Sequence, residues 1–161
     1  ISSQLEGGKN SAQYALLPNL AKEQKLLLVH NTFSESSDIE EIETHFSLAY
    51  WCTCPKANWY IEKQLPNYDL WRKKNLKITI GTDSLASNDT LSVLEEVKMI
   101  QKNFPHISTN ELLIWACKNG AEFFNYDELG SFKTGSKPGI VLIEDVDGLQ
   151  LTEKSRVTVL V

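Results

Sequence analysis

Three short apolar runs separated by helix-like segments constrain the fold of this chain more than any other feature of its sequence. The runs cover residues 26–30, 46–52 and 77–81, and the segments between them carry apolar residues at helical spacing. Strands that alternate with helices favour parallel pairing, because each crossing segment returns the chain to the same end of the sheet. Three strands cannot close a barrel by themselves. The sequence therefore predicts an α/β fold with an open parallel sheet.

The segments around the apolar runs predict the helices. Ile39, Ile42 and Phe46 are spaced by three and four residues, which marks one buried helical face. Pro55 should end the pairing of the second strand, so a loop is expected after it. Helices are predicted over residues 11–22, from the cap segment Ser36-Ser37-Asp38, from Pro66, after Ser87-Asn88-Asp89-Thr90, and from Ser108 or Thr109, the last with Leu112, Leu113, Ala116 and Cys117 on its apolar side.

The last part of the chain has a different pattern. Glycines punctuate it, and residues 140–143 and 156–161 are typical of strands on either side of a turn at Asp147-Gly148. We therefore predict two units. Residues 1–128 would form the α/β unit, and residues 129–161 would form part of a small β subdomain.

The composition is typical of a soluble protein with one sizeable core. The chain has 161 residues, of which 42% are hydrophobic, and its net charge of −5 argues against a nucleic-acid partner. No apolar stretch approaches the roughly 20 residues that cross a bilayer, and no signal-peptide pattern opens the sequence. We expect no membrane partner and a cytoplasmic location. The opening residues, from Ile1, resemble the interior of a longer protein.

Cys52 and Cys54 are two of the three cysteines, and their spacing places both side chains on one face of a strand. Neighbouring positions on one face of an extended segment have poor disulfide geometry. The sequence offers no second Cys/His pair at zinc-site spacing. A buried, reduced pair is the favoured interpretation over a metal role.

Two of the apolar runs end in residues that can move a proton. Asp83 follows the run 77–81, and His30 closes the run 26–30. The carboxyl ends of parallel strands are where α/β barrels hold their catalytic groups. We therefore predict that Asp83 and His30 belong to one catalytic site. The alternatives are a turn-capping aspartate and a hydrogen-bonded core histidine.

Three further residues near the strand ends are candidates for substrate binding. Asn58 either orients the catalytic region or closes its loop through an Asx turn. Trp59 lies near the expected mouth of the site, although tryptophans mostly pack cores. Ser84 is a supporting or capping hydroxyl rather than a nucleophile, because no base stands at a recognisable spacing. His45 and His106 are expected on the surface.

Five short motifs, taken in order, resemble the amidohydrolase superfamily. Residues 28–32 (Leu-Val-His-Asn-Thr) resemble its sixth barrel strand, residues 54–58 (Cys-Pro-Lys-Ala-Asn) its Cys-Pro-Arg-Ser-Asn loop, and residues 80–88 its eighth strand and following loop. Residues 116–121 are similar to its Ala-Thr-x-x-Gly-Ala helix, and residues 130–141 to its Gly-Ser-Leu segment. The combination resembles the C-terminal half of the nucleoside, base and triazine deaminase branch, the chlorohydrolase or cytosine-deaminase-like group.

This resemblance implies the C-terminal part of a TIM (β/α)8 barrel, about strands six to eight, followed by strands of a small β subdomain. It also implies a metal-dependent hydrolase in which Asp83 ligates a divalent ion, zinc or alternatively iron or manganese, and shuttles the proton of the attacking water. His30 would contact the water or the leaving group in a mononuclear site, or bind a second ion. Metal binding suits this chemistry, because it lowers the pKa of water from 15.7 to about 7.

The chain also departs from the family pattern. The His-x-His pair of strand one and the histidine of strand five are absent, since the only histidines are His30, His45 and His106. The remaining metal ligands are therefore expected outside this chain. Lys56 and Ala57 replace the family's Arg and Ser, which changes the substrate contacts of that loop.

The function implied by the resemblance is deamination or hydrolysis of a small amino- or amide-bearing ring or nucleoside-like substrate. The same chemistry also serves cyclic amides and carbon–halogen bonds, and a noncatalytic interaction or folding module is the alternative from another class. The expected partners are a small-molecule substrate and either the missing N-terminal half of the protein or another copy, as in a homo-oligomer.

Overall fold

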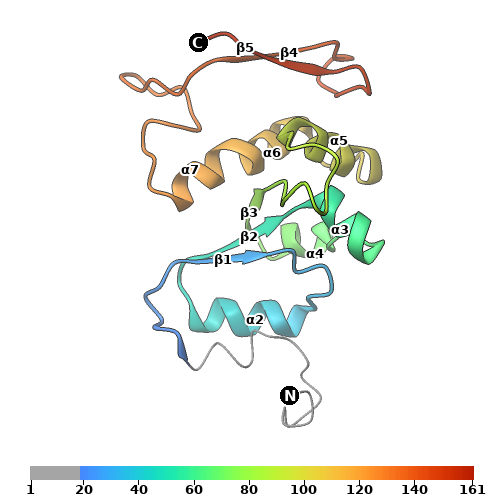
Figure 1. The fold of residues 1–161 in the computed structure, drawn as a ribbon. Helices are drawn as coiled ribbons and strands as arrows, with labels where there is room; N and C mark the ends of the chain where they lie inside the picture. Colours follow the sequence, from blue (N-terminus) through green and yellow to red (C-terminus); the bar gives the residue numbers. More distant parts are fainter. Residues whose placement is uncertain (1–18) are drawn as a thin grey trace.

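The computed structural model describes residues 19–161 and contains two sheets and the helices that pack against them (Figure 1). The helix expected over residues 11–22 lies mostly outside the described residues, and its last part is not α-helical. The elements in chain order are β1 (Leu26–Val29), α2 (Ser36–His45), β2 (Ala49–Thr53), α3 (Pro55–Glu62), α4 (Tyr68–Lys73), β3 (Lys77–Ile80), α5 (Val93–Asn103), α6 (Thr109–Leu113), a π-helical turn (Ile114–Lys118), α7 (Asn119–Phe123), β4 (Val141–Glu144) and β5 (Arg156–Val159).

The first sheet confirms the predicted parallel pairing. Its order is β1-β2-β3, with Val29 opposite Cys52 and Thr53 opposite Ile80. The central strand β2 is buried along its whole length. Phe46 is buried with Ile39 and Ile42, as the helical spacing predicts, but it does not belong to β2: it caps the end of α2, where its N–H donates to the carbonyl of Ile42. The chain is therefore α/β with a parallel sheet.

The two faces of this sheet have different environments, because side chains alternate along each strand. Trp51 and Ile78 point toward the helices and join one core with residues from α2, α4, α5 and α6. Leu27 and Cys52 lie on the opposite face, in a small separate cluster. One layer of helices therefore covers one face of the sheet.

The segment after β2 differs from the prediction. Residues 55–62 form helix α3, with Pro55 at its first position, whereas a loop was expected. Proline suits this position because its missing N–H would have no intrahelical partner there. Pro66 does not begin the next helix either. Asn67 caps α4 instead, and its side chain accepts from the N–H of Leu70 at 3.0 Å.

Side chains at the helix starts cap α2 and α6. Glu35, rather than the predicted Ser36-Ser37-Asp38 segment, is the cap residue of α2, and its N–H donates to Asp38 at 2.8 Å. Ser108 caps α6, which decides between the two predicted residues.

Cys117 is exposed rather than on an apolar face. The π-helical turn adds a residue to one turn, which rotates the following side chains away from the 3.6-residue pattern.

The C-terminal residues form the predicted antiparallel ribbon of β4 and β5, which lies beyond α5, α6 and α7 (Figure 1). A bridge between Asp147 and Gln150 closes the expected turn. The ribbon is joined to α5 where the N–H of Leu151 donates to the side-chain oxygen of Gln101 at 2.9 Å. The domain division at residues 128 and 129 stays a prediction.

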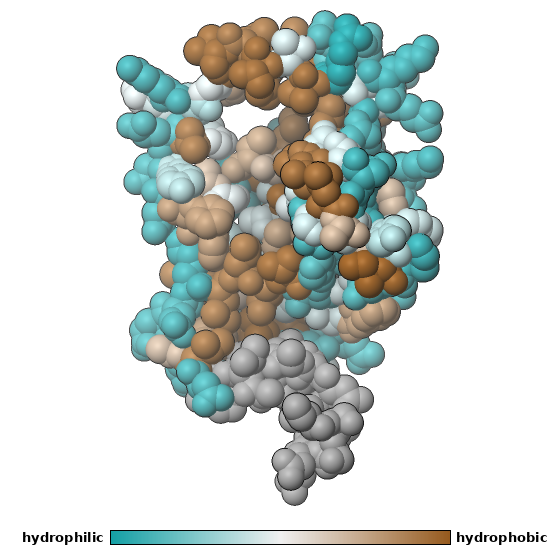
Figure 2. Space-filling view, in the orientation of Figure 1, coloured by the Kyte–Doolittle hydropathy of each residue, from teal (hydrophilic) through white to brown (hydrophobic). Residues whose placement is uncertain are grey.

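Apolar side chains remain on the surface of this ribbon. Figure 2 shows them gathered at the top of the view, over β4 and β5. Val141 is 55% exposed and Val159 is 74% exposed. No helix within residues 19–161 has the length and apolar character needed to cross a membrane.

Candidate functional site

The parallel sheet brings His30 and Asp83 together. His30 directly follows β1, and Asp83 lies three residues after β3, so both stand at the carboxyl ends of strands that flank β2. His30 Nε2 is 4.0 Å from Asp83 Oδ2, and about a third of each side chain is exposed. This distance is too long for a hydrogen bond. The two groups therefore face each other with one side open to solvent.

The backbone is strained at these two residues. His30 has a φ of 72° and Asp83 a φ of 58°, both in the left-handed region that non-glycine residues rarely adopt. Each such residue costs roughly 1–3 kcal/mol, and such residues cluster at functional sites. The N–H of His30 donates to the carbonyl of Cys52 at 2.9 Å, which ties the turn to the sheet.

Asn58 holds the His30 ring. Its Oδ1 lies 3.2 Å from His30 Nδ1, and its Nδ2 donates to the hydroxyl of Thr32. An amide oxygen can only accept, so His30 Nδ1 donates its proton to Asn58, and Nε2 faces Asp83. Asn58 is only 1% exposed. The contact favours the orienting role for Asn58 over a local Asx turn.

Ser87 holds the Asp83 carboxylate. Its hydroxyl donates to Asp83 Oδ2 at 2.6 Å, and this bond is the main reason that the pKa of Asp83 lies below its ordinary value. Ser84, the predicted candidate, is exposed, and its hydroxyl accepts from the N–H of Ala86 within the turn. Sequence reasoning therefore missed the serine that contacts the carboxylate. The sequence feature that could have indicated this contact is a serine four residues after Asp83.

Two thiols lie close to this pair of residues. Cys52 and Cys54 are both buried and free, as predicted. A Cβ at Gly81 would stand 3.2 Å from Cys52 Sγ and 3.3 Å from Cys54 Sγ, so glycine makes room for both sulfurs. The neighbouring Cys54 thiol lowers the pKa of Cys52, whereas the neighbouring Cys52 and burial raise the pKa of Cys54.

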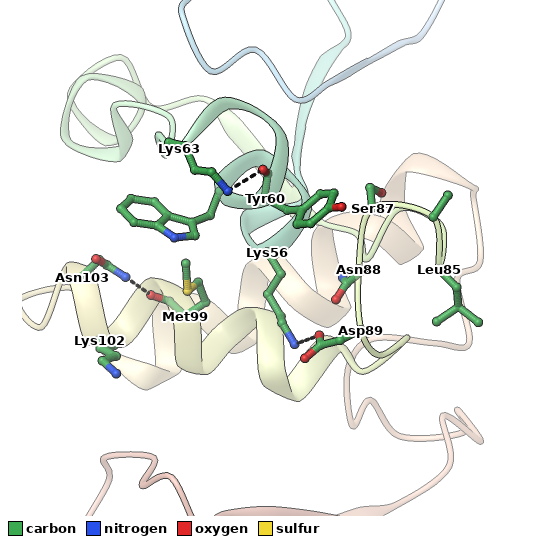
Figure 3. A pocket seen from close by; sticks show the side chains of 12 residues that line it. Lys56, Tyr60, Lys63, Leu85, Ser87, Asn88, Asp89, Met99, Lys102 and Asn103 are labelled. Atoms are coloured by element: carbon green, nitrogen blue, oxygen red, sulfur yellow. Dashed lines mark hydrogen bonds and ion pairs between the residues drawn. The ribbon is translucent and has the colours of Figure 1, made fainter.

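Trp59 is separate from the His30 and Asp83 pair. It is 46% exposed and lines a groove of about 700 Å³ between α3, the loop after β3 and α5 (Figure 3). Lys56 contacts Asp89 in this groove, and Ser87 also lines it. The groove therefore adjoins the serine that holds Asp83. A substrate contact by Trp59 stays a prediction.

The other two histidines have surface roles. His45 Nδ1 lies 2.9 Å from the carbonyl oxygen of Glu41, and His106 Nε2 lies 2.7 Å from Asp69 Oδ1. Both are exposed, as predicted.

The paired residues fit a divalent metal ion as ligands. An imidazole nitrogen and a carboxylate oxygen are ligand types that zinc, iron and manganese accept. Within residues 19–161, no three His, Cys, Asp or Glu side chains form a group that could hold a metal ion. Catalytic zinc sites usually have three protein ligands. His30 and Asp83 can therefore supply part of such a site.

Comparison with known proteins identifies the family. The sequence matches the Amidohydrolase family over residues 4–159. The chain belongs to this family. The resemblance in the sequence motifs is thereby confirmed.

Curated relatives of this amidohydrolase include nucleoside deaminases. It is 27% identical to an adenosine deaminase of Helicobacter pylori over 107 residues, which cover 65% of this chain and 26% of that protein. It is 25% identical to a 5-methylthioadenosine/S-adenosylhomocysteine deaminase of Dictyoglomus thermophilum over 127 residues, which cover 74% of this chain and 29% of the relative. The chain thus spans under a third of the length of these relatives.

Solved structures share the fold. Helicobacter pylori aminofutalosine deaminase in complex with methylthio-coformycin matches with a TM-score of 0.68 at 23% identity, over 81% of this chain and 32% of that one. A zinc-bound adenosine deaminase from Xanthomonas campestris matches with a TM-score of 0.64 at 20% identity, over 76% of this chain and 29% of that one. At these identities the likeness concerns the fold alone.

Proposed function

We propose that this amidohydrolase chain is the C-terminal part of a metal-dependent deaminase that hydrolyses the amino group of a nucleoside-like substrate. The family match supports the hydrolytic class, and the names of the curated relatives support the substrate class. Residues 1–128 would contribute about strands six to eight of a (β/α)8 barrel, and residues 129–161 would contribute strands of a β subdomain. The cytoplasmic location stays a prediction from the sequence.

The observation that carries this proposal is the opposition of His30 Nε2 and Asp83 Oδ2 at 4.0 Å. When bound, a divalent ion would acidify a water molecule and polarise the carbon–nitrogen bond under attack. Asp83, kept ionised by Ser87, would take a proton from the attacking water and return it to the leaving amine. His30, held by Asn58, would present its Nε2 lone pair to the same space.

Zinc is the proposed ion, because a zinc-bound deaminase is among the similar folds, and iron and manganese accept the same ligands. A small-molecule substrate would enter at the carboxyl ends of the strands. Trp59 is the proposed substrate contact in the adjoining groove, and Ser84 is proposed as a further contact in the exposed turn after Asp83. The remaining ligands would come from another part of the protein or from another copy.

The whole protein, loaded in turn with zinc, iron and manganese, should release ammonia from adenosine, 5-methylthioadenosine or a related aminated heterocycle. Asp83→Asn should abolish this release and leave the circular dichroism spectrum unchanged, because only the carboxylate is lost. Wild-type kcat in Asp83→Asn would refute the assignment. A wild-type protein that releases ammonia from none of these compounds with any metal would favour the noncatalytic module.

His30→Ala separates one-metal from two-metal sites. It should reduce kcat severely, and in a mononuclear site metal content should fall less than in Asp83→Ala. His45→Ala is the matched control, since His45 is exposed on α2 and away from the strand ends. Metal analysis of the three purified variants decides the question. A control variant that loses as much kcat as His30→Ala would contradict the role given to His30.

A further inference from the structure

Glu96 on α5 is a fully buried acid, with 0% of the residue exposed. Burial raises the pKa of this carboxyl group. A buried acid is costly unless hydrogen-bond donors surround it. The donors that meet Glu96 come from the two segments that carry the candidate site.

The first donor is the start of α3. The N–H of Lys56 donates to Glu96 Oε2 at 2.8 Å. The cap residue of α3, Cys54, makes no side-chain cap hydrogen bond, so Glu96 supplies from another helix what a local cap would supply. Asn58, which holds the His30 ring, lies two residues after Lys56 in the same helical turn. Glu96 therefore anchors the turn that orients His30.

The second donor is the loop after β3. Asn88 Nδ2 donates to Glu96 Oε1 at 2.6 Å and also to the carbonyl of Thr82 at 2.7 Å. The Thr82 carbonyl belongs to the peptide bond that leads into Asp83, where the backbone is left-handed. Figure 3 shows Lys56 on α3 and Asn88 on the loop that faces it. Glu96 therefore also anchors the peptide that presents the carboxylate.

We propose that Glu96 is a positioning residue that sets the separation between His30 and Asp83. It acts through Lys56 and Asn58 on the imidazole, and through Asn88 and Thr82 on the carboxylate. Its effect on catalysis rests on the proposed deaminase function, whereas its effect on the geometry of the two side chains does not. A residue with only a structural role would change stability without changing the His30 environment.

The test uses Glu96→Gln in the whole protein. Glutamine retains the size of the side chain and one acceptor oxygen, but it turns an NH2 donor toward one of the two N–H partners. We expect kcat to fall roughly tenfold or more, because small misplacements of reacting groups are costly. KM should stay within about twofold, since substrate binding is not altered. The 15N signals of the His30 ring should shift in the metal-free protein.

Glu95→Gln is the matched control. Glu95 is the preceding residue of the same helix, and its carboxylate contacts Lys98 at 2.6 Å near the surface. The substitution removes the same charge without touching the site, so kcat and the His30 signals should be unchanged. If Glu96→Gln does not fold, Asn88→Ala tests the same link, because it removes the side chain that joins Glu96 to the Thr82 carbonyl, together with the acceptor for the N–H of Thr90.

Wild-type kcat and unchanged His30 signals in the folded variant would overturn the proposal. So would a loss of kcat in Glu95→Gln equal to that in Glu96→Gln. If the whole protein proves inactive toward every substrate, the proposed function fails, but the His30 signals still decide the role of Glu96. A shift in Glu96→Gln and none in Glu95→Gln would support it.

Discussion

At the scale of single residues, neutral side chains hold both candidate catalytic groups. Asn58 contacts the imidazole of His30, and Ser87 donates to the carboxylate of Asp83. Neither partner carries a charge: the amide oxygen of Asn58 accepts from the ring, and the hydroxyl of Ser87 lowers the pKa of the Asp83 carboxyl group. The alignment of Nε2 and Oδ2 depends on these two partners.

Ser87→Ala should raise the pKa of Asp83 toward its ordinary value, because the lost hydroxyl bond favours the ionised form. Asp83 has a lowered pKa in the folded state, so its stabilising effect is present above the unfolded-state pKa and is lost as pH falls through the folded-state value. In the variant this loss should occur at higher pH. A 13C carboxyl NMR titration of the metal-free protein measures the pKa, and urea denaturation at several pH values measures the loss of stability.

Ser84→Ala is the control for this titration. Its hydroxyl contacts only the turn, and the backbone N–H that lowers the pKa of Asp83 is retained. The titration of Asp83 should be unchanged in this variant. An Asp83 pKa that rises equally in both variants would contradict the role given to Ser87.

At the scale of elements, aromatic packing joins α4 to β2. The ring of Trp71 lies 5.8 Å from that of Trp51 and 5.7 Å from that of Tyr68, between centroids. All three residues are 0% exposed. Tyr68 also donates to or accepts from Thr53 at 2.7 Å, which satisfies its buried hydroxyl. The buried, closely packed aromatic rings therefore hold α4 against β2.

Trp71→Ala should destabilise the protein by about 3–5 kcal/mol, because it leaves a large cavity in this aromatic cluster. Trp59→Ala should cost about 1 kcal/mol or less, since Trp59 is half exposed in the groove. Urea denaturation of the two variants measures the difference. Equal losses of stability would contradict the assignment of Trp71 to the core and of Trp59 to the surface.

The cap of α5 gives a second prediction at this scale. The Ser92 side chain accepts from the N–H of Glu95 at the start of the helix that carries Glu96. Ser92→Ala should cost about 1 kcal/mol of stability. Ser37→Ala, an exposed serine inside the first turn of α2, should have little effect. Chemical denaturation distinguishes a cap from an ordinary surface serine.

At the scale of the whole molecule, the described sheet has two unpaired edges. β1 and β3 are the outer strands, and Val29 at the end of β1 is 45% exposed. The β4–β5 ribbon also exposes apolar side chains, among them Leu160 and Val161. Unpaired edges and apolar surface favour association with further strands.

The isolated 161-residue chain should therefore associate, either with itself or with the remainder of the barrel. Light scattering should detect species larger than the 18.2 kDa monomer. If the N-terminal barrel segment is added and its strands pair with β1 and β3, these species should convert to a complex of defined size. A monodisperse monomer that unfolds cooperatively without any partner would refute the partial-barrel interpretation.

The same chain should not bind zinc tightly at one-to-one stoichiometry. His30 and Asp83 supply two ligands, and within residues 19–161 no group of three suitable side chains is present. Two ligands are fewer than catalytic zinc sites usually have. Calorimetry at neutral pH provides the measurement. Tight one-to-one binding would show that a further ligand in this chain was overlooked.

The sequence by itself determined the alternation of strands with helices, the parallel sheet and the strand ends that carry His30 and Asp83. These follow from local periodicity and from the rule that crossing helices make neighbouring strands parallel. It did not reveal helix α3, because Pro55 can either end a strand or begin a helix and only its packing distinguishes the two. It also did not reveal that Ser87 contacts Asp83 or that Asn58 contacts His30, because these contacts depend on the conformation of a turn and of a helix start that no short sequence pattern describes.

Only the tertiary structure placed Glu96 against both arms of the site. Its bond to Lys56 joins residues 40 positions apart, and the contact between Asn58 and His30 spans 28 positions. Such contacts depend on how α5 packs beside α3 and how both lie against the sheet. Their energies come from hydrogen bonds made in a buried space, which the local sequence does not encode.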